Sequence, residues 1–217
     1  MEEKRITETM LDSLRDQLRG EMSEKRYRHT VAVEEMAIRL GELYLPKDIP
    51  QLRAAALLHD ITKEFSLENQ LQILQRFGII TYYSDKISPK TLHARTAALL
   101  IPEKYPAFAD PRVIEAVRWH TTGRAGMSVS EKLIYLADYI DMSRTFPDCV
   151  ALREMFWGAD PAGMSGEERE AHLRAVLLSS FDRTVAALLE EGSLISPETM
   201  LARNELVEET RRAQDQT

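Results

Sequence analysis

The residues of this chain best suited to chemistry are His59 and Asp60, an imidazole and a carboxylate that directly follow the apolar run 54–58. A helix that continued its core face through these positions would bury both groups. Burying an unpaired polar side chain costs about 2–7 kcal/mol, and burying a charge costs far more. Because a bound metal ion offsets that cost directly, the pair is a candidate for metal ligation, and this interpretation depends on further histidines and carboxylates elsewhere in the chain.

Four further imidazole or carboxylate side chains stand in segments that otherwise have the apolar periodicity of helix cores. They are His29, His93, His120 and Asp138. Asp138 lies between two pairs of apolar residues, so it must either face the core or pair with another group. The intervals between the candidates are long and unequal, unlike those of a zinc finger, and tertiary packing of helices must therefore assemble any site.

Imidazole and carboxylate ligands without thiolate suit iron, manganese, cobalt, nickel or zinc, and they suit calcium poorly. A carboxylate beside a histidine can also bridge two ions ~3.5–4 Å apart, so one ion and two ions both stay open. The fifth histidine, His172, lies in the charged segment 168–172, and we interpret it as a hydrogen-bonded residue of the surface or the core, outside the site. Considered singly, Lys63 and Arg144 have the character of solvated surface charges.

Composition limits the partners of this chain of 217 residues. A net charge of −7 argues against nonspecific nucleic-acid binding, which needs a basic surface, but a small polyanionic substrate needs only local positive charge. The single cysteine, Cys149, excludes an internal disulfide and fits a reduced thiol in the cytoplasm. We expect no membrane span, since aliphatic runs such as 97–101 fall far short of ~20 residues, and the N-terminus lacks a signal-peptide pattern.

Helical periodicity and capping signals divide nearly the whole chain into the helices that must position these side chains. Capping residues followed by proline, and two capping boxes, mark helix starts at 88–89, 110–111, 128–131, 165–168 and 196–197. The expected helices cover residues 7–18, 23–44, 50–61, 67–77, 89 onward, 111–120, 131–143, 166–191 and 197–213.

No run of alternating polarity is long enough for a sheet, so the predicted fold class is all-α. Residues 78–88 are expected to form an irregular loop, and 157–163 are the best candidate for a linker. We expect a helical core over 1–156 and C-terminal helices over 157–217 that pack back on the same domain. The candidate side chains then fall mostly at helix ends, with Asp138 inside a helix.

The order of His29, His59-Asp60 and Asp138 resembles that of the HD-domain superfamily of metal-dependent phosphohydrolases, which is all-α. Further motifs narrow the resemblance to the YqeK family over roughly residues 21–208. These motifs are RYRHT at 26–30, AALLHDITK at 55–63, LHA at 92–94, HTTG at 120–123, ADYIDMSR at 137–144 and ISPETMLARN at 195–204.

The resemblance implies symmetrical hydrolysis of diadenosine tetraphosphate to two molecules of ADP. It implies metal ligands at His29, His59, Asp60 and Asp138, with iron as the usual metal and manganese, cobalt or nickel as alternatives. On this hypothesis the catalytic residues are Asp60, Lys63, His93 and His120. The residues expected to contact the dinucleoside polyphosphate are His29, Lys63, His93, His120, Thr121, Asp138 and Arg144.

Two sister families of the HD superfamily carry motifs, downstream of their conserved histidine positions, that this chain lacks. Cyclic-di-GMP phosphodiesterases carry a Gly-Tyr-Pro signature where this chain has 121–124, and alarmone hydrolases carry acidic residues where it has Thr62-Lys63. The segment 141–143 departs from the YqeK family, whose members often have glutamate followed by proline, and this leaves the placement of Arg144 open. The alternatives are another HD-superfamily nucleotide phosphohydrolase, such as a nucleotidase, or a noncatalytic nucleotide-sensing HD domain. A homodimer also stays open.

Overall fold

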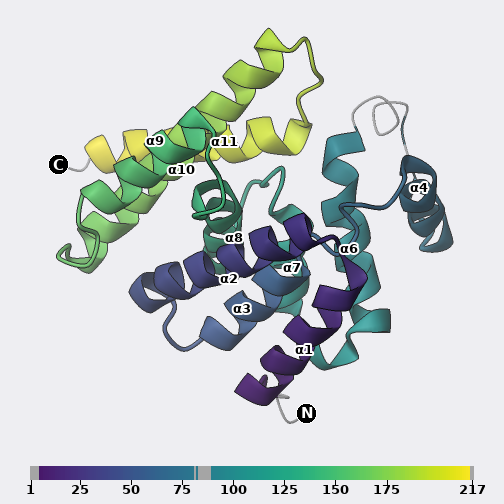
Figure 1. Cartoon of the computed structure of the whole chain (residues 1–217). Coiled ribbons are helices and arrows are strands. Elements are labelled where there is room, and N and C mark those ends of the chain that lie inside the picture. Colours follow the sequence, from purple (N-terminus) through teal and green to yellow (C-terminus); the bar gives the residue numbers. More distant parts are fainter. Residues whose placement is uncertain (1–4, 81, 83–88, 216–217) are drawn as a thin grey trace.

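In a computed structural model, which describes residues 5–80, 82 and 89–215, helices provide the regular structure and no strand occurs within these ranges (Figure 1). The all-α prediction is therefore confirmed. The expected loop 78–88 falls largely outside the described residues. The helices are α1 (Glu8–Glu21), α2 (Glu24–Tyr44), α3 (Ile49–Leu58), α4 (Leu67–Arg76), η1 (Pro89–Thr91), α6 (Leu92–Lys104), η2 (Pro106–Phe108), α7 (Pro111–Trp119), α8 (Val129–Ile140), α9 (Pro147–Gly158), α10 (Gly166–Glu190) and α11 (Pro197–Gln214).

Most helices begin where the sequence predicts, because a capping side chain accepts a hydrogen bond from a backbone N–H of the first turn. Each such cap contributes about 1 kcal/mol. The serines at 128 and 165 also form complete capping boxes with the glutamates three residues later. The capping residues are Thr7, Ser23, Ser66, Asp110, Ser128, Ser165 and Ser196.

Several element boundaries differ from the expectation, and helix α1 runs to Glu21 rather than 18. Helix α3 ends at Leu58 rather than 61, and a turn follows in which the N–H of Lys63 donates to the carbonyl of Asp60 (3.0 Å). Helix α8 ends at Ile140 rather than 143, because Asp141 is extended. Helix α9 lies outside the expected helices and runs to Gly158. Trp157 in its last turn packs on Phe156 and lies under the guanidinium of Arg39, so the linker is 159–165 rather than 157–163.

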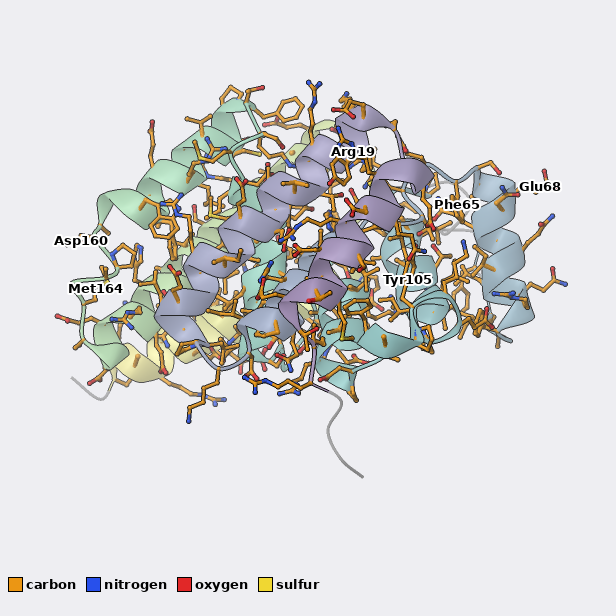
Figure 2. All side chains as sticks on the ribbon, turned by 60° about the horizontal axis from the view of Figure 1, so that its bottom comes forward. Arg19, Phe65, Glu68, Tyr105, Asp160 and Met164 are labelled. Carbon is orange, nitrogen blue, oxygen red and sulfur yellow. The ribbon has the colours of Figure 1, made fainter. Side chains whose placement is uncertain are left out.

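The central bundle consists of α2, α3, α7 and α8. The apolar side chains between these helices are fully buried, and they include Leu40, Leu57, Val117 and Leu133. Helix α1 packs on α2 and α3, α6 packs on α7, and α4 packs on α6 at the side of the molecule (Figure 1). Helices α9 and α10 pack on α8, and α11 packs on α10. Side chains fill the space between the helices, with Glu68 of α4 at one end and Asp160 of the linker at the other (Figure 2).

The C-terminal helices contact both α8 and the turn that precedes it. The ring of Phe181 stacks on Tyr135 with centroids 4.6 Å apart, and the hydroxyl of Thr199 donates to the carbonyl of Thr122 (2.9 Å). Gly123 has a φ of +63°, and a Cβ there would lie 2.6 Å from the Phe181 ring. Only glycine therefore satisfies both the backbone conformation and the close packing at this position.

Among the described residues, no helix combines the length and the apolar character that crossing a membrane requires.

Candidate metal centre

Three elements bring His29 of α2, His59 at the end of α3 and Asp138 of α8 together. The Nε2 atom of His29 lies 2.9 Å from Oδ1 of Asp138, and Nε2 of His59 lies 3.8 Å from the same oxygen. The two imidazole rings meet edge to face with centroids 5.4 Å apart. Ligand atoms of all three side chains lie within 4.8 Å of one another, close enough for one metal ion to contact each of them.

Asp60 stands between this group and a second pair of histidines. Its Oδ2 lies 3.3 Å from Nε2 of His59 and 3.8 Å from Nε2 of His29. Its Oδ1 lies 3.2 Å from Nε2 of His93 and 3.9 Å from Nε2 of His120. Since the Nε2 atoms of His93 and His120 are themselves 3.0 Å apart, the six predicted side chains converge on one site.

The ends of α3 and α7 orient two of the histidines in the same way. Nδ1 of His59 lies 2.6 Å from the carbonyl oxygen of Ala56, and Nδ1 of His120 lies 2.7 Å from that of Val117. A carbonyl oxygen can accept a hydrogen bond but cannot donate one, so Nδ1 carries the hydrogen in both rings. The Nε2 lone pairs are thus left facing Asp60, in the tautomer that ligates a metal through Nε2.

His29 is oriented instead by the segment that follows α8. Its Nδ1 lies 3.2 Å from Oγ of Ser143 and 3.5 Å from Oδ2 of Asp141. Asp141 is fully buried, and its Oδ1 accepts hydrogen bonds from the backbone N–H (2.8 Å) and the hydroxyl of Ser143. The sequence indicated no role for Asp141, although a carboxylate directly after an apolar helix end is the signal that identified Asp60.

The site fits a metal ion by the character of its unsatisfied atoms. Nε2 of His29 and of His59 are buried, and neither atom forms a hydrogen bond of regular geometry with any of the described residues. Imidazole nitrogens that are buried without a hydrogen bond cost free energy. The same donor set is suited to a divalent transition metal, which satisfies these atoms together.

Burial and mutual charge set the protonation of the site. Burial works to raise the pKa of Asp60, but the imidazoles of His59 and His93 outweigh it and hold that pKa well below its ordinary value. At Asp138 burial also acts upward, and Arg144 and His29 hold the pKa well below the ordinary value. Burial, with help from His59 and His93, lowers the pKa of His120 to about 3. Both carboxylates are therefore ionised and His120 is neutral near pH 7.

Cationic side chains border the acidic ligands. Nζ of Lys63 lies 3.2 Å from Nε2 of His93, and burial lowers the pKa of this lysine. A guanidinium nitrogen of Arg144 donates to Oδ1 of Asp138 (2.6 Å), and one of Arg26 donates to Oδ2 of Asp60 (2.5 Å). Such a rim favours an anionic ligand. No role was predicted for Arg26, although it lies in the RYRHT motif.

Thr121 lies in the site, whereas His172 lies outside it. The hydroxyl of Thr121 is 3.1 Å from Nε2 of His120 and 3.2 Å from Nε2 of His93, so it belongs to the site. His172 of α10 is half-buried, and its Nε2 lies 2.9 Å from the carbonyl oxygen of Phe156. It lies outside the cluster, and its contact with the Phe156 carbonyl of α9 fits the interpretation of a hydrogen-bonded residue.

A family model and three curated proteins are similar to this chain in sequence. A family model described as HD domain matches residues 26–143. Three curated proteins are each named symmetrical bis(5'-nucleosyl)-tetraphosphatase. The one from Halalkalibacterium halodurans is 34% identical over 190 residues (86% of this chain, 91% of the relative), and the one from Bacillus subtilis is 32% identical over 190 residues (88% and 94%). The one from Staphylococcus aureus is 36% identical over 137 residues (62% and 68%).

A solved structure is also similar. It is the crystal structure of a protein from Clostridium acetobutylicum described as a predicted HD superfamily hydrolase involved in NAD metabolism. The two chains are 31% identical with a TM-score of 0.78, and the match covers 91% of this chain and 97% of the other.

Proposed function

This chain belongs to the YqeK family of HD-domain proteins, and we propose that it is a metal-dependent symmetrical bis(5'-nucleosyl)-tetraphosphatase. Its substrate is diadenosine tetraphosphate and its product is ADP alone. The observation that carries the proposal is the convergence of four histidines and two ionised carboxylates beneath a cationic rim. That arrangement is suited to a polyphosphate, whose negative oxygens otherwise repel a nucleophile.

The metal ligands in this proposal are His29, His59, Asp60 and Asp138. His93 and His120 either contact the phosphates or complete a second metal position. Iron is the metal we favour, with manganese, cobalt and nickel as alternatives that the same nitrogen and oxygen donors accept. A metal ion bound there would screen the phosphate oxygens and lower the pKa of water toward ~7.

The protein's own side chains hold the substrate and compensate the charge that develops. Lys63 and Arg144 stand beside the ligands and stabilise negative charge on the phosphate oxygens and on the departing ADP. The Thr121 hydroxyl donates to a phosphate oxygen, and Oδ1 of Asp60 orients the attacking water. The low pKa of His120 keeps its Nε2 unprotonated and free to accept a hydrogen bond or to ligate.

Residues 157–217 form one domain with 1–156, which the stacking of Phe181 on Tyr135 supports. The protein acts in the cytoplasm, where the free thiol of Cys149 is stable.

The direct test is hydrolysis of diadenosine tetraphosphate by protein loaded with iron, manganese or cobalt, with the products separated by chromatography. We expect ADP as the one nucleotide product. A mixture of ATP and AMP would mean asymmetric cleavage and would contradict the proposal. A panel with mononucleotides and NAD distinguishes a nucleotidase or another HD phosphohydrolase, which would cleave those compounds in preference.

A further inference from the structure

We propose that a cavity beside the metal centre binds one nucleoside of the dinucleotide, with a base that packs on Trp119; this assignment rests on the proposed function. The cavity has a volume of about 460 Å³ and lies between the start of α6, the end of α7 and the segment 194–198. This volume is in the range of small-molecule pockets. Its lining includes Arg95, Arg118, Trp119, Thr122, Ile195 and Glu198.

The cavity adjoins the metal centre through the turn after α7. The Thr121 hydroxyl contacts the site histidines, and the next residue, Thr122, lines the cavity. Arg95 and Arg118 each stand two positions from a site histidine on their own helix, and such positions point to different faces. Two phosphates separate the cleaved bond from each nucleoside, so a nucleoside subsite must lie next to the metal centre without overlapping it.

The lining has the chemistry that recognises a nucleotide. Trp119 is fixed by a hydrogen bond from its Nε1 to Glu115 (2.9 Å), and the guanidinium of Arg118 lies 4.4 Å from its ring centroid. Aromatic rings and guanidinium planes are the surfaces on which bases stack, and arginine also pairs with phosphate oxygens. Among the described lining residues Glu198 is the one carboxylate, and it accepts from the Ser196 hydroxyl.

The proposal also assigns a function to the C-terminal segment 195–204. The motif at 195–204 contributes no residue to the metal cluster, yet its first residues form a wall of the cavity. This wall is held in place by the Ser196 cap of α11 and by the bond from the Thr199 hydroxyl to the Thr122 carbonyl (2.9 Å). The C-terminal helices therefore complete the substrate site from outside the HD core.

Intrinsic fluorescence can test the pocket, since the chain has two tryptophans. Trp157→Phe leaves Trp119 as the sole reporter, and it removes a buried indole N–H that has no hydrogen-bond partner among the described residues. We expect ADP to quench this emission saturably and inorganic pyrophosphate to leave it unchanged. If ADP does not change the emission of Trp119, or if inorganic pyrophosphate changes it equally, the assignment is wrong.

Kinetics of Trp119→Ala give a second readout. We expect the KM for diadenosine tetraphosphate to rise about tenfold with little change in kcat, because a stacked base is lost. Trp119→Phe should restore most of the loss, and the inhibition constant of inorganic pyrophosphate should not change. An unchanged KM, or inhibition by pyrophosphate that weakens by the same factor, contradicts a nucleoside subsite.

The two proposals fail in different ways. If the wild-type protein yields no ADP from diadenosine tetraphosphate, the proposed function is wrong, and the ADP titration still reports on the cavity. If the wild type yields ADP while Trp119 neither responds to ADP nor affects KM, the subsite alone is wrong.

Discussion

At the scale of single residues, Asp60 is the centre of the site, since its two oxygens face different pairs of histidines. We expect Asp60→Ala to abolish hydrolysis of diadenosine tetraphosphate and to lower the metal content of the purified protein. His172→Ala is the matched control, because His172 contacts Phe156 away from the cluster, and it should change neither quantity. Full turnover by a metal-loaded Asp60→Ala protein would refute the ligand assignment.

Asp141 offers a second prediction at this scale. Its carboxylate, with Ser143, faces Nδ1 of His29, and outer partners of this kind orient a ligating imidazole. We expect Asp141→Asn to weaken metal affinity about 10–100-fold, measured by competition with a chelator. Asp148→Asn, an exposed aspartate that pairs with Arg183, should leave the affinity unchanged. Equal affinities for both variants would show that Asp141 does not act through His29.

The sequence was sufficient to select the six clustered side chains, because they are imidazole or carboxylate groups in segments with the apolar periodicity of helices and because their order matches the family motifs. It was not sufficient for Asp141 and Arg26. Their significance comes from contacts with residues 112 and 34 positions away, to His29 and Asp60 respectively, which local pattern cannot report.

At the scale of elements, α1 is joined to the bundle by a buried ionic network. Glu34 of α2 is 1% exposed and accepts from Arg15 of α1 (2.5 Å) and Arg53 of α3 (2.9 Å), and Arg53 also contacts Glu8. Removing one partner of a buried network leaves the others uncompensated.

We therefore expect Glu34→Gln to lower the free energy of unfolding by about 3 kcal/mol in urea titration. Asp12→Asn, whose carboxylate is largely exposed beside the same Arg15, should have little effect. If the two variants unfold at the same urea concentration, α1 is not held by this network.

Helix starts were more predictable than helix ends for a physical reason. A start is fixed by a local capping side chain, whereas α3 and α8 end next to Asp60 and Asp141, whose carboxylates contact histidines of other helices. The helix α9 was not anticipated, and its Arg153 holds the segment after α8 by donating to the carbonyls of Ile140 (2.8 Å) and Arg144 (2.7 Å).

At the scale of the whole molecule, the C-terminal helices and the HD core meet at Gly123. An alanine there would need a left-handed backbone and would clash with Phe181. We expect Gly123→Ala to lower the free energy of unfolding by about 2 kcal/mol or more and to weaken the response of Trp119 to ADP. Gly20→Ala is the control, since nothing lies within 4 Å of a Cβ there, and it should be neutral or stabilising. Equal stability of the two variants would contradict tight docking.

The fold class and the family motifs could be predicted because they depend on periodicity and on residue identity. The cavity could not, since it is formed by three segments whose contact depends on how α11 packs against the turn after α7.

The central claim is that His29, His59, Asp60 and Asp138 hold the metal on which hydrolysis depends. A crystal of the iron-loaded protein, measured on both sides of the iron absorption edge, tests it most directly. The account predicts an anomalous peak within ligand distance of these four side chains. A catalytically active crystal whose anomalous peak lies elsewhere, or that has none, would contradict it.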